Sequence, residues 1–209
     1  ELPGAGVVHV VGADADKVIN NQCTNDIKKL SVGHLCESFV TNVRGWCVEH
    51  GYVCKLDGEI LLVGQFGNAA YLANHIERYI VREDARVADL TANKTVLLLN
   101  AEEVATVAKE FGLRSFRPKP GELHTCSMGD LQMFVAATSM LSAGDQLMIG
   151  NLDDRAKAFA TLKTAGISLE SESQFELKRI LNFWPRAGRE ILEKSLPQEL
   201  DRDASAISF

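Results

Sequence analysis

The sequence of 209 residues has no apolar run long enough to cross a membrane and no excess of positive charge. A membrane-spanning helix needs roughly 18 or more consecutive apolar residues. With 22 Lys and Arg against 28 Asp and Glu, the net charge of −6 provides no basic surface for phosphates. We therefore predict neither a membrane nor a nucleic acid as a direct partner.

Cysteine is scarce, odd in number and never arranged as C-x-x-C. This spacing fits neither a disulfide framework nor a zinc site, and the five histidines show no metal-ligand spacing. We expect reduced, mostly buried thiols, no metal and a cytoplasmic location, or an organelle matrix if a targeting peptide was removed before Glu1. The cysteines are Cys23, Cys36, Cys47, Cys54 and Cys126.

Two stretches of the chain repeat the same strand and helix pattern. "VVHVVGADADKVI" predicts a strand at 7–11 and a short helix that begins near Asp14. "KTVLLLNAEEVATVAKEFG" predicts a strand at 95–99 and a helix capped by Asn100, with Glu103 at the capping-box position. Later, "ILLVGQFGNAAYLANHIERYI" and "QLMIGNLDDRAKAFATLKTAG" again share one pattern. The nearly equal separations indicate an internal duplication.

Further strand candidates connect these units. Strand-rich halves with two helices each predict an α+β fold. We place the boundary near 90–93, which gives a first half at 1–92 and a second half at 93–209, with a loop at 117–121. The additional strands are predicted at 37–41, 47–55, 59–63, 86–90, 123–127, 131–136 and 146–149.

Three segments resemble a known superfamily. "SFVTNVRGWCVEHGYV" resembles the T-N-x-x-G-G segment of the aminomethyltransferase (glycine cleavage T protein, GcvT) family, and "NQCTNDIKKLSVG" resembles the preceding Q-x-T-N-D-x-x-x-L-x-x-G. "FELKRILNFWPRAGREILEKSLPQELDRDASAISF" is similar to the R-I-E-x-G-I-P…L-P-Q-E…I-S-F segment of its folate-binding, YgfZ-like branch. The resemblance runs from Val8 to Phe209 and implies duplicated ferredoxin-like folate-binding domains.

The family pattern also implies a continuation beyond Phe209. In YgfZ-like proteins a K-G-C-Y-x-G-Q-E segment and a small C-terminal barrel follow, so we expect both to be absent from this chain. Residues 206–209 read as the first residues of a strand, which agrees with a chain that stops before its last domain.

The resemblance also implies the site residues. The folate-binding residues would be Asn42, Trp46, Glu49 and Arg179. The family's Asp pair falls on Glu49 and His50, which are therefore the candidate catalytic residues. A carboxylate there would hold the N–H groups of a pterin or bear the charge that develops on an amine. Because neighbouring side chains of a strand point to opposite faces, only one of the pair can line a pocket.

Arg179 and Trp46 each keep two interpretations. Arg179 lies on a helix that Ser173 and Glu176 are expected to open as a capping box, and it matches the Arg of the R-I-E motif. Its fork could hold a carboxylate, or it could be an ordinary exposed or ion-paired arginine. Trp46 could stack on a flat heterocycle or simply pack. The helix's apolar stripe would be Leu177, Ile180, Leu181 and Trp184.

Three functions follow from the resemblance. The first is a tetrahydrofolate-binding YgfZ-like protein that supports iron-sulfur enzyme maturation or repair, with tetrahydrofolate or a one-carbon derivative as cofactor and an iron-sulfur protein as partner. The second is an aminomethyltransferase that passes a one-carbon unit to tetrahydrofolate. The third is a non-catalytic interaction scaffold. The Glu49-His50 pair, Leu181 in place of the motif's Glu, and the L-P-Q-E ending favour the first.

Overall fold

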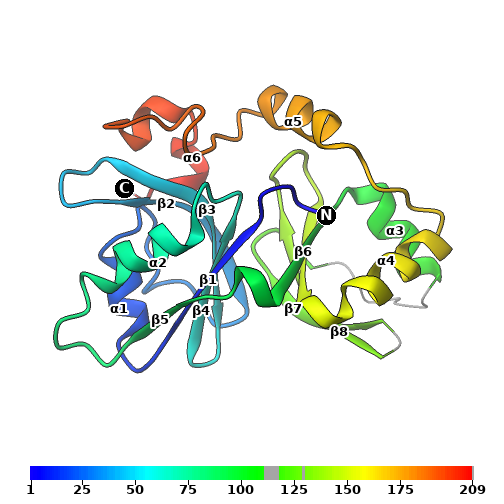
Figure 1. The fold of residues 1–209 in the computed structure, drawn as a ribbon, viewed down its shortest axis with the longest axis horizontal. Helices are drawn as coiled ribbons and strands as arrows, with labels where there is room; N and C mark the ends of the chain where they lie inside the picture. Colours follow the sequence, from blue (N-terminus) through cyan, green and yellow to red (C-terminus); the bar gives the residue numbers. More distant parts are fainter. Residues whose placement is uncertain (111–117, 129, 209) are drawn as a thin grey trace. The chain divides into compact units, whose positions relative to one another are not determined.

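The computed structural model describes residues 1–110, 118–128 and 130–208 (Figure 1). They form two compact units, each built on an antiparallel sheet. The five-stranded unit contains Gly4–Thr91 and Pro185–Phe209, and the four-stranded unit contains Glu1–Pro3 and Ala92–Trp184. The chain is thus a mixed α and β protein with antiparallel sheets, as the α+β prediction requires.

The five-stranded unit has the strand order β2-β3-β4-β1-β5. Every neighbouring pair of strands is antiparallel, and β3 pairs with β2 through a bulge at Val40/Thr41. All five strands and both helices lie within a few residues of their predicted positions. The elements are β1 (Gly6–Val11), α1 (Ala15–Asn20), β2 (His34–Thr41), β3 (Cys47–Leu56), β4 (Glu59–Gly64), α2 (Ala69–Glu77) and β5 (Arg86–Asp89).

Helices α1 and α2 cover one face of this sheet. The side chain of Asn68 caps α2 by accepting a hydrogen bond from the backbone N–H of Tyr71 at 2.9 Å. Apolar side chains of both helices and of the alternate positions of β1, β3 and β4 then form one buried core. Its central members are Val8, Val10, Val18, Ile19, Val53, Leu62, Leu72 and Ile76.

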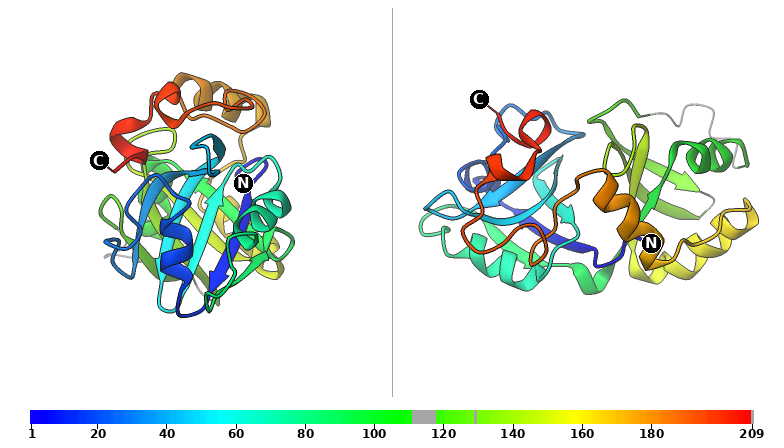
Figure 2. Two further views of the ribbon diagram at one scale, coloured as in Figure 1. Left: turned by 90° about the vertical axis from the view of Figure 1, so that its left-hand side faces the viewer. Right: turned by 90° about the horizontal axis from the view of Figure 1, so that it is seen from above.

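The C-terminal segment covers the opposite face of β2 and β3. It includes η3 (Pro197–Leu200) and α6 (Asp203–Ala206), and the views of Figure 2 show its red ribbon beside β2. Backbone hydrogen bonds join it to β3, from Cys47 N to Ser195 O at 2.8 Å, and to the turn after α1, from Ser208 N to Thr24 O at 3.0 Å. Residues 185–209, which the sequence assigns to the second half, therefore pack with the first sheet.

The expected strand at 206–209 is not formed. Ala206 ends the short helix α6 instead, and Ile207 is extended but pairs with no strand, while Phe209 lies outside the described residues. The hydroxyl of Thr24 donates a hydrogen bond to Ala206 O at 2.6 Å. This contact ties α6 to the start of the polar T-N-D turn, and the local sequence alone does not reveal it.

The four-stranded unit has the strand order β6-β9-β8-β7. This order matches β1-β4-β3-β2 of the other sheet, strand for strand in chain order. The predicted capping box of α3 is confirmed, with Asn100 N donating to Glu103 at 2.8 Å and Glu103 N donating to Asn100 at 3.0 Å. The expected end of α3 at Gly112 and the first residue of the loop expected at 117–121 lie outside the described residues, and 118–121 contain no helix or strand. The elements are β6 (Lys94–Leu99), α3 (Ala101–Glu110), β7 (Leu123–Met128), β8 (Leu131–Thr138), β9 (Asp145–Asn151), α4 (Arg155–Thr164) and α5 (Glu172–Leu181).

Helix α5 differs from its prediction in its cap and in its buried face. Ser171 and Gln174 form the capping box, two residues earlier than the expected pair, with Ser171 N donating to Gln174 at 3.0 Å. The stripe expected to be buried is exposed at Leu177, Ile180 and Leu181. Of the expected stripe Trp184 alone is buried, and Phe175 and Arg179 are buried in place of the other three.

All five cysteines are free thiols, as predicted. Three are buried and two are half-buried, and burial raises the pKa of Cys23, Cys36, Cys47 and Cys54 to about 12. A thiol with so high a pKa is a weak nucleophile at neutral pH. Within the described ranges, the chain has no helix of sufficient length and apolar character to traverse a bilayer.

Candidate functional site

The turn between β2 and β3 carries two of the predicted site residues, Asn42 and Trp46. The side-chain oxygen of Asn42 accepts hydrogen bonds from the backbone N–H of Arg44 at 2.9 Å and of Trp46 at 3.2 Å. Gly45 adopts a φ of 75° in the same turn, a conformation that favours glycine. Asn42 therefore shapes the turn, and its amide NH₂ is the part of the side chain left for a ligand.

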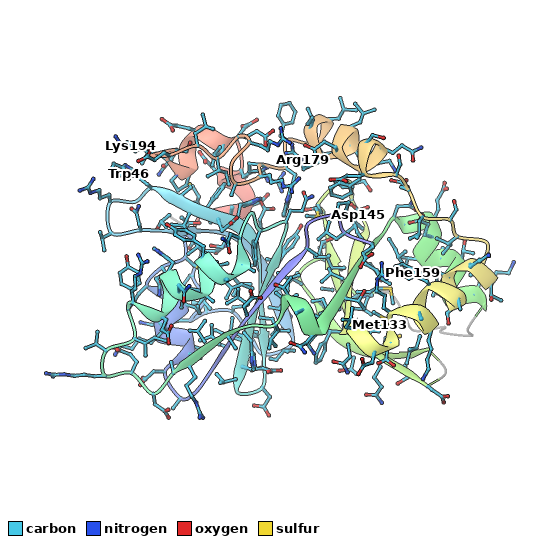
Figure 3. All side chains as sticks on the ribbon, in the orientation of Figure 1. Trp46, Met133, Asp145, Phe159, Arg179 and Lys194 are labelled. Atoms are coloured by element: carbon cyan, nitrogen blue, oxygen red, sulfur yellow. The ribbon has the colours of Figure 1, made fainter. Side chains whose placement is uncertain are left out.

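Trp46 lies half-buried at the end of this turn, between two cationic side chains. The guanidinium carbon of Arg44 is 4.9 Å from the indole centroid and the ammonium nitrogen of Lys194 is 5.6 Å from it (Figure 3). Both distances are within the range of cation–π attraction. An indole flanked by two positive charges suits a flat ligand that carries negative charge.

Glu49 is buried on β3, with only 3% of its surface exposed. One carboxylate oxygen accepts a hydrogen bond from the backbone N–H of Gly67 at 3.0 Å, just before α2. The other oxygen, Oε2, is buried and has no hydrogen-bond partner among the described residues. A buried polar atom without a partner is costly, because it loses its hydration and gains nothing in return.

The surroundings of Glu49 change its acidity. Burial raises the pKa of the carboxyl to about 7, although the backbone N–H groups of Gly67 and Asn68 and the charge of Arg186 act in the opposite direction. Near neutral pH the group is therefore present both as acid and as carboxylate. Such a group can give or take a proton and can also bind an N–H donor.

His50 points to the opposite face of β3, as the alternation of the strand predicts. Its ring lies 2.8 Å from Glu37 Oε1 through Nε2 and 3.3 Å from the carbonyl oxygen of Pro185 through Nδ1. Arg202 donates to both oxygens of Glu37, at 2.7 Å and 2.5 Å. The buried Glu37 and His50 and the half-buried Arg202 form a cluster, Glu37-His50-Arg202, that attaches the C-terminal segment to the sheet. The His50 ring thus contacts other protein groups and does not face an open site.

The sequence analysis misses Glu37 and Arg202. A single charged residue within the apolar strand "HLCESFVT" is the signal that could identify Glu37, since buried carboxylates are rarely left unpaired. Burial acts to raise the pKa of Glu37, but the hydrogen bonds and charges of Arg202 and His50 outweigh it and the pKa is lowered. Glu37 therefore stays ionised inside the cluster.

Arg179 belongs to the four-stranded unit and is only 1% exposed. Its guanidinium holds the carboxylate of Glu176 in a fork at 3.0 Å and 2.5 Å, and it donates to the carbonyl oxygen of Trp184 at 2.5 Å. The fork expected for a ligand carboxylate is thus occupied by a carboxylate of the same helix.

The four-stranded unit contains a pocket of about 280 Å³. It lies between β6, the start of α3, and residues of α4 and α5, and none of the predicted site residues lines it. Several of its polar groups are already bonded within the unit. Asp145, for example, accepts hydrogen bonds from Leu141 N and Ser142 N at 2.8 Å each and from Ser142 Oγ at 2.6 Å. The lining apolar side chains include Leu99, Leu162, Ile167 and Phe175.

Comparison with known proteins identifies the fold. The glycine cleavage system aminomethyltransferase T from Bartonella henselae superposes with a TM-score of 0.66 at 16% identity, over 77% of this chain and 44% of that chain. A chain of the heterotetrameric sarcosine oxidase from Corynebacterium sp. U-96 superposes with a TM-score of 0.57 at 18% identity, over 82% of this chain and 86% of that one. The chain shares their fold.

The same comparisons support a shared fold but not a shared function. The match spans less than half of the aminomethyltransferase chain. No protein-family model matches the sequence, and a search of curated proteins gives no match. The sequence resemblance to the aminomethyltransferase family and the structural similarity thus agree on the fold, and the functional assignment depends on the site.

Proposed function

We propose that this chain binds tetrahydrofolate, or a one-carbon derivative of it, as a YgfZ-like protein with a duplicated ferredoxin-like scaffold. The observation that carries the proposal is the buried Oε2 of Glu49, which lacks a hydrogen-bond partner among the described residues. A ligand with N–H groups, such as a pterin, would supply the missing donor and offset the loss of hydration. The fold shared with an aminomethyltransferase supports the same ligand class.

The surroundings of Trp46 suit the negatively charged part of such a ligand. Folates carry glutamate carboxylates beyond the flat ring system, and Arg44 and Lys194 provide positive charge beside the indole. Trp46 directly precedes β3 and Glu49 lies on it, so both proposed ligand groups belong to the same unit. Arg179 remains a prediction as a folate-binding residue.

A matched pair of variants tests the proposal. Calorimetric titration of reduced tetrahydrofolate into the protein should show saturable binding, and Glu49→Gln should weaken it at least tenfold, because the carboxylate that receives the N–H donors is lost. Glu77→Gln makes the same change from carboxylate to amide at an exposed position of α2 in the same unit. This variant should bind tetrahydrofolate like the wild type. Equal affinities for all three proteins would reject Glu49 as a ligand-binding group.

Glu49 also favours the aminomethyltransferase alternative. A carboxyl with a pKa of about 7 can act as general acid or base on the amine of a one-carbon donor. Formation of methylenetetrahydrofolate from a protein-bound or free aminomethyl donor, lost in Glu49→Gln, would support transfer. Binding without turnover supports the accessory role, in which iron-sulfur proteins are the proposed partners.

The scaffold alternative rests on the second structural neighbour. This chain spans 86% of one chain of a heterotetrameric sarcosine oxidase, so a protein of this size and fold serves as one chain of a multi-subunit enzyme. Failure of the wild-type protein to bind tetrahydrofolate by calorimetry and by thermal shift would favour that role for this chain as well.

A further inference from the structure

Helix α5 exposes an apolar ridge made of Leu177, Ile180, Leu181 and Phe183. These four side chains are between 53% and 67% exposed, and the first three have the i, i+3, i+4 spacing that places them on one helix face. Amphipathic surface helices normally bury such a face and turn their charges to water. In α5 the charged Arg179 is inside and the apolar ridge is outside.

Phe183 adds an independent observation. Its φ of 52° lies in the left-handed region, which is unfavourable for a bulky residue and costs on average more than for glycine or asparagine. The turn is closed by hydrogen bonds from Phe183 N to Ile180 O and from Trp184 N to Arg179 O, both at 3.1 Å. Glycine would be the favoured residue at this position if the turn only ended the helix. The strained backbone instead carries an aromatic side chain that is 67% exposed, just after the end of α5.

We propose that the α5 ridge is the self-association surface of this protein and that its occupant is the same ridge of a second copy. The ridge carries no charge, and the neighbouring charges are already paired within each chain, Lys178 with Glu170 and Arg179 with Glu176. Two ridges can therefore face each other about a two-fold axis without bringing together unpaired charges.

The area agrees with a weak dimer. Side chains of this size and exposure present roughly 500 Å² of apolar surface per copy, so that two copies would bury roughly 1,000 Å² in total. That area is at the lower limit of specific interfaces, which are typically about 1,600 Å². The dimer should therefore form at high protein concentration and dissociate on dilution. This inference is independent of the folate proposal, since no residue of the ridge is among the proposed folate-binding residues.

Sedimentation velocity over a concentration series tests the proposal. The wild type should shift from monomer to dimer as its concentration rises, and Leu181→Glu should remain monomeric because a carboxylate would be buried in the interface. Leu152→Glu, an equally polar change at an exposed leucine of the same unit outside the ridge, should dimerise like the wild type. A monomeric wild type at every concentration, or a dimer that Leu181→Glu does not weaken, would overturn the proposal.

Two further variants separate association from folding. Phe183→Gly should raise the midpoint of thermal unfolding by relieving the left-handed backbone, and should weaken the dimer at least tenfold by removing an anchor. A more stable protein that associates less cannot be explained by misfolding. Ile180→Cys should form an intermolecular disulfide under mild oxidation, whereas Leu152→Cys should not. Equal cross-linking at both positions would place the contact elsewhere.

Discussion

Glu37 receives hydrogen bonds from Arg202 at 2.7 Å and lies 2.8 Å from His50, so one buried carboxylate joins strands β2 and β3 to the C-terminal segment. These two partners, Arg202 and His50, come from positions far apart in the sequence. Burying an ion pair gains little by itself, but removing one partner leaves an uncompensated charge inside the protein. The cluster therefore fixes the position of residues 185–209 more than it adds to total stability.

Arg202→Ala should lower the free energy of unfolding by about 3–5 kcal/mol, because Glu37 would remain buried without its strongest partner. Urea denaturation of the two proteins measures the difference. Arg189→Ala, at an exposed arginine of the same segment, is the matched control and should change stability by less than about 0.5 kcal/mol. A loss below about 1 kcal/mol for Arg202→Ala would show that the pair is solvated in solution.

The close packing at Gly64 gives a second prediction. A Cβ there would lie 2.7 Å from the ring of Phe66 and 2.9 Å from the carbonyl oxygen of His50, so Gly64→Ala should cost about 1–3 kcal/mol. Gly67→Ala meets only ordinary contacts, the nearest at 3.6 Å, and should cost less than about 1 kcal/mol. Thermal unfolding of the two variants distinguishes them, and equal losses would contradict the packing described for β4.

Local sequence patterns predict most of this fold but little of its site. Alternating apolar residues and the Asn100 cap identify strands and helices because these signals act within a few residues. The exposed ridge of α5 escapes prediction, since periodicity shows that a helix is amphipathic but not which face the rest of the chain covers. The Glu37-His50-Arg202 cluster escapes it as well, because the partners meet only after the C-terminal segment folds back onto β2 and β3.

The same limit applies to the site residues taken from the family resemblance. Asn42 lies in a turn, and its side-chain oxygen accepts the hydrogen bonds that hold that turn. His50 is placed correctly opposite Glu49, yet its ring contacts Glu37 and Pro185. Only the structure distinguishes these bonded groups from Glu49, whose Oε2 has no partner in the described part of the chain. Residue identity alone cannot show which buried group is satisfied.

Arg179→Ala tests Arg179, the residue that matches the R-I-E motif, by two measurements: the free energy of unfolding and the affinity for tetrahydrofolate. The substitution removes the partner of Glu176 and of the Trp184 carbonyl, so the free energy of unfolding should fall by about 2–4 kcal/mol. If Arg179 acts only within its own helix, tetrahydrofolate affinity under folding conditions should stay within about twofold of the wild type. A tenfold weaker affinity in the folded variant would restore the role that the R-I-E resemblance implies. Arg179→Lys, which keeps the charge but not the fork, should be intermediate in stability.

The pH dependence of Glu49 links stability to binding. Its pKa is raised from 4.5 to about 7, so the folded state holds a proton that the unfolded state releases between these values. The contribution of Glu49 to stability is therefore fully present below pH 4.5 and is lost as the pH rises through about 7. Glu49→Gln cannot ionise, so relative to the wild type it should gain on the order of 2–3 kcal/mol between pH 4.5 and pH 8. Urea titrations at several pH values measure this difference, and parallel stability curves for the two proteins would contradict the raised pKa.

A ligand that donates N–H groups to Glu49 should bind more tightly as the pH rises, whereas the stability of the free protein falls. Such a ligand binds the carboxylate form, so tetrahydrofolate affinity of the wild type should rise as the pH increases from 6 to 8, by up to about tenfold, while Glu49→Gln should show a flat profile. A protonated carboxyl that donates to the ligand would give the opposite slope. Because a purely structural glutamate would change stability with pH without changing ligand affinity, the slope of affinity against pH decides whether Glu49 contacts the ligand.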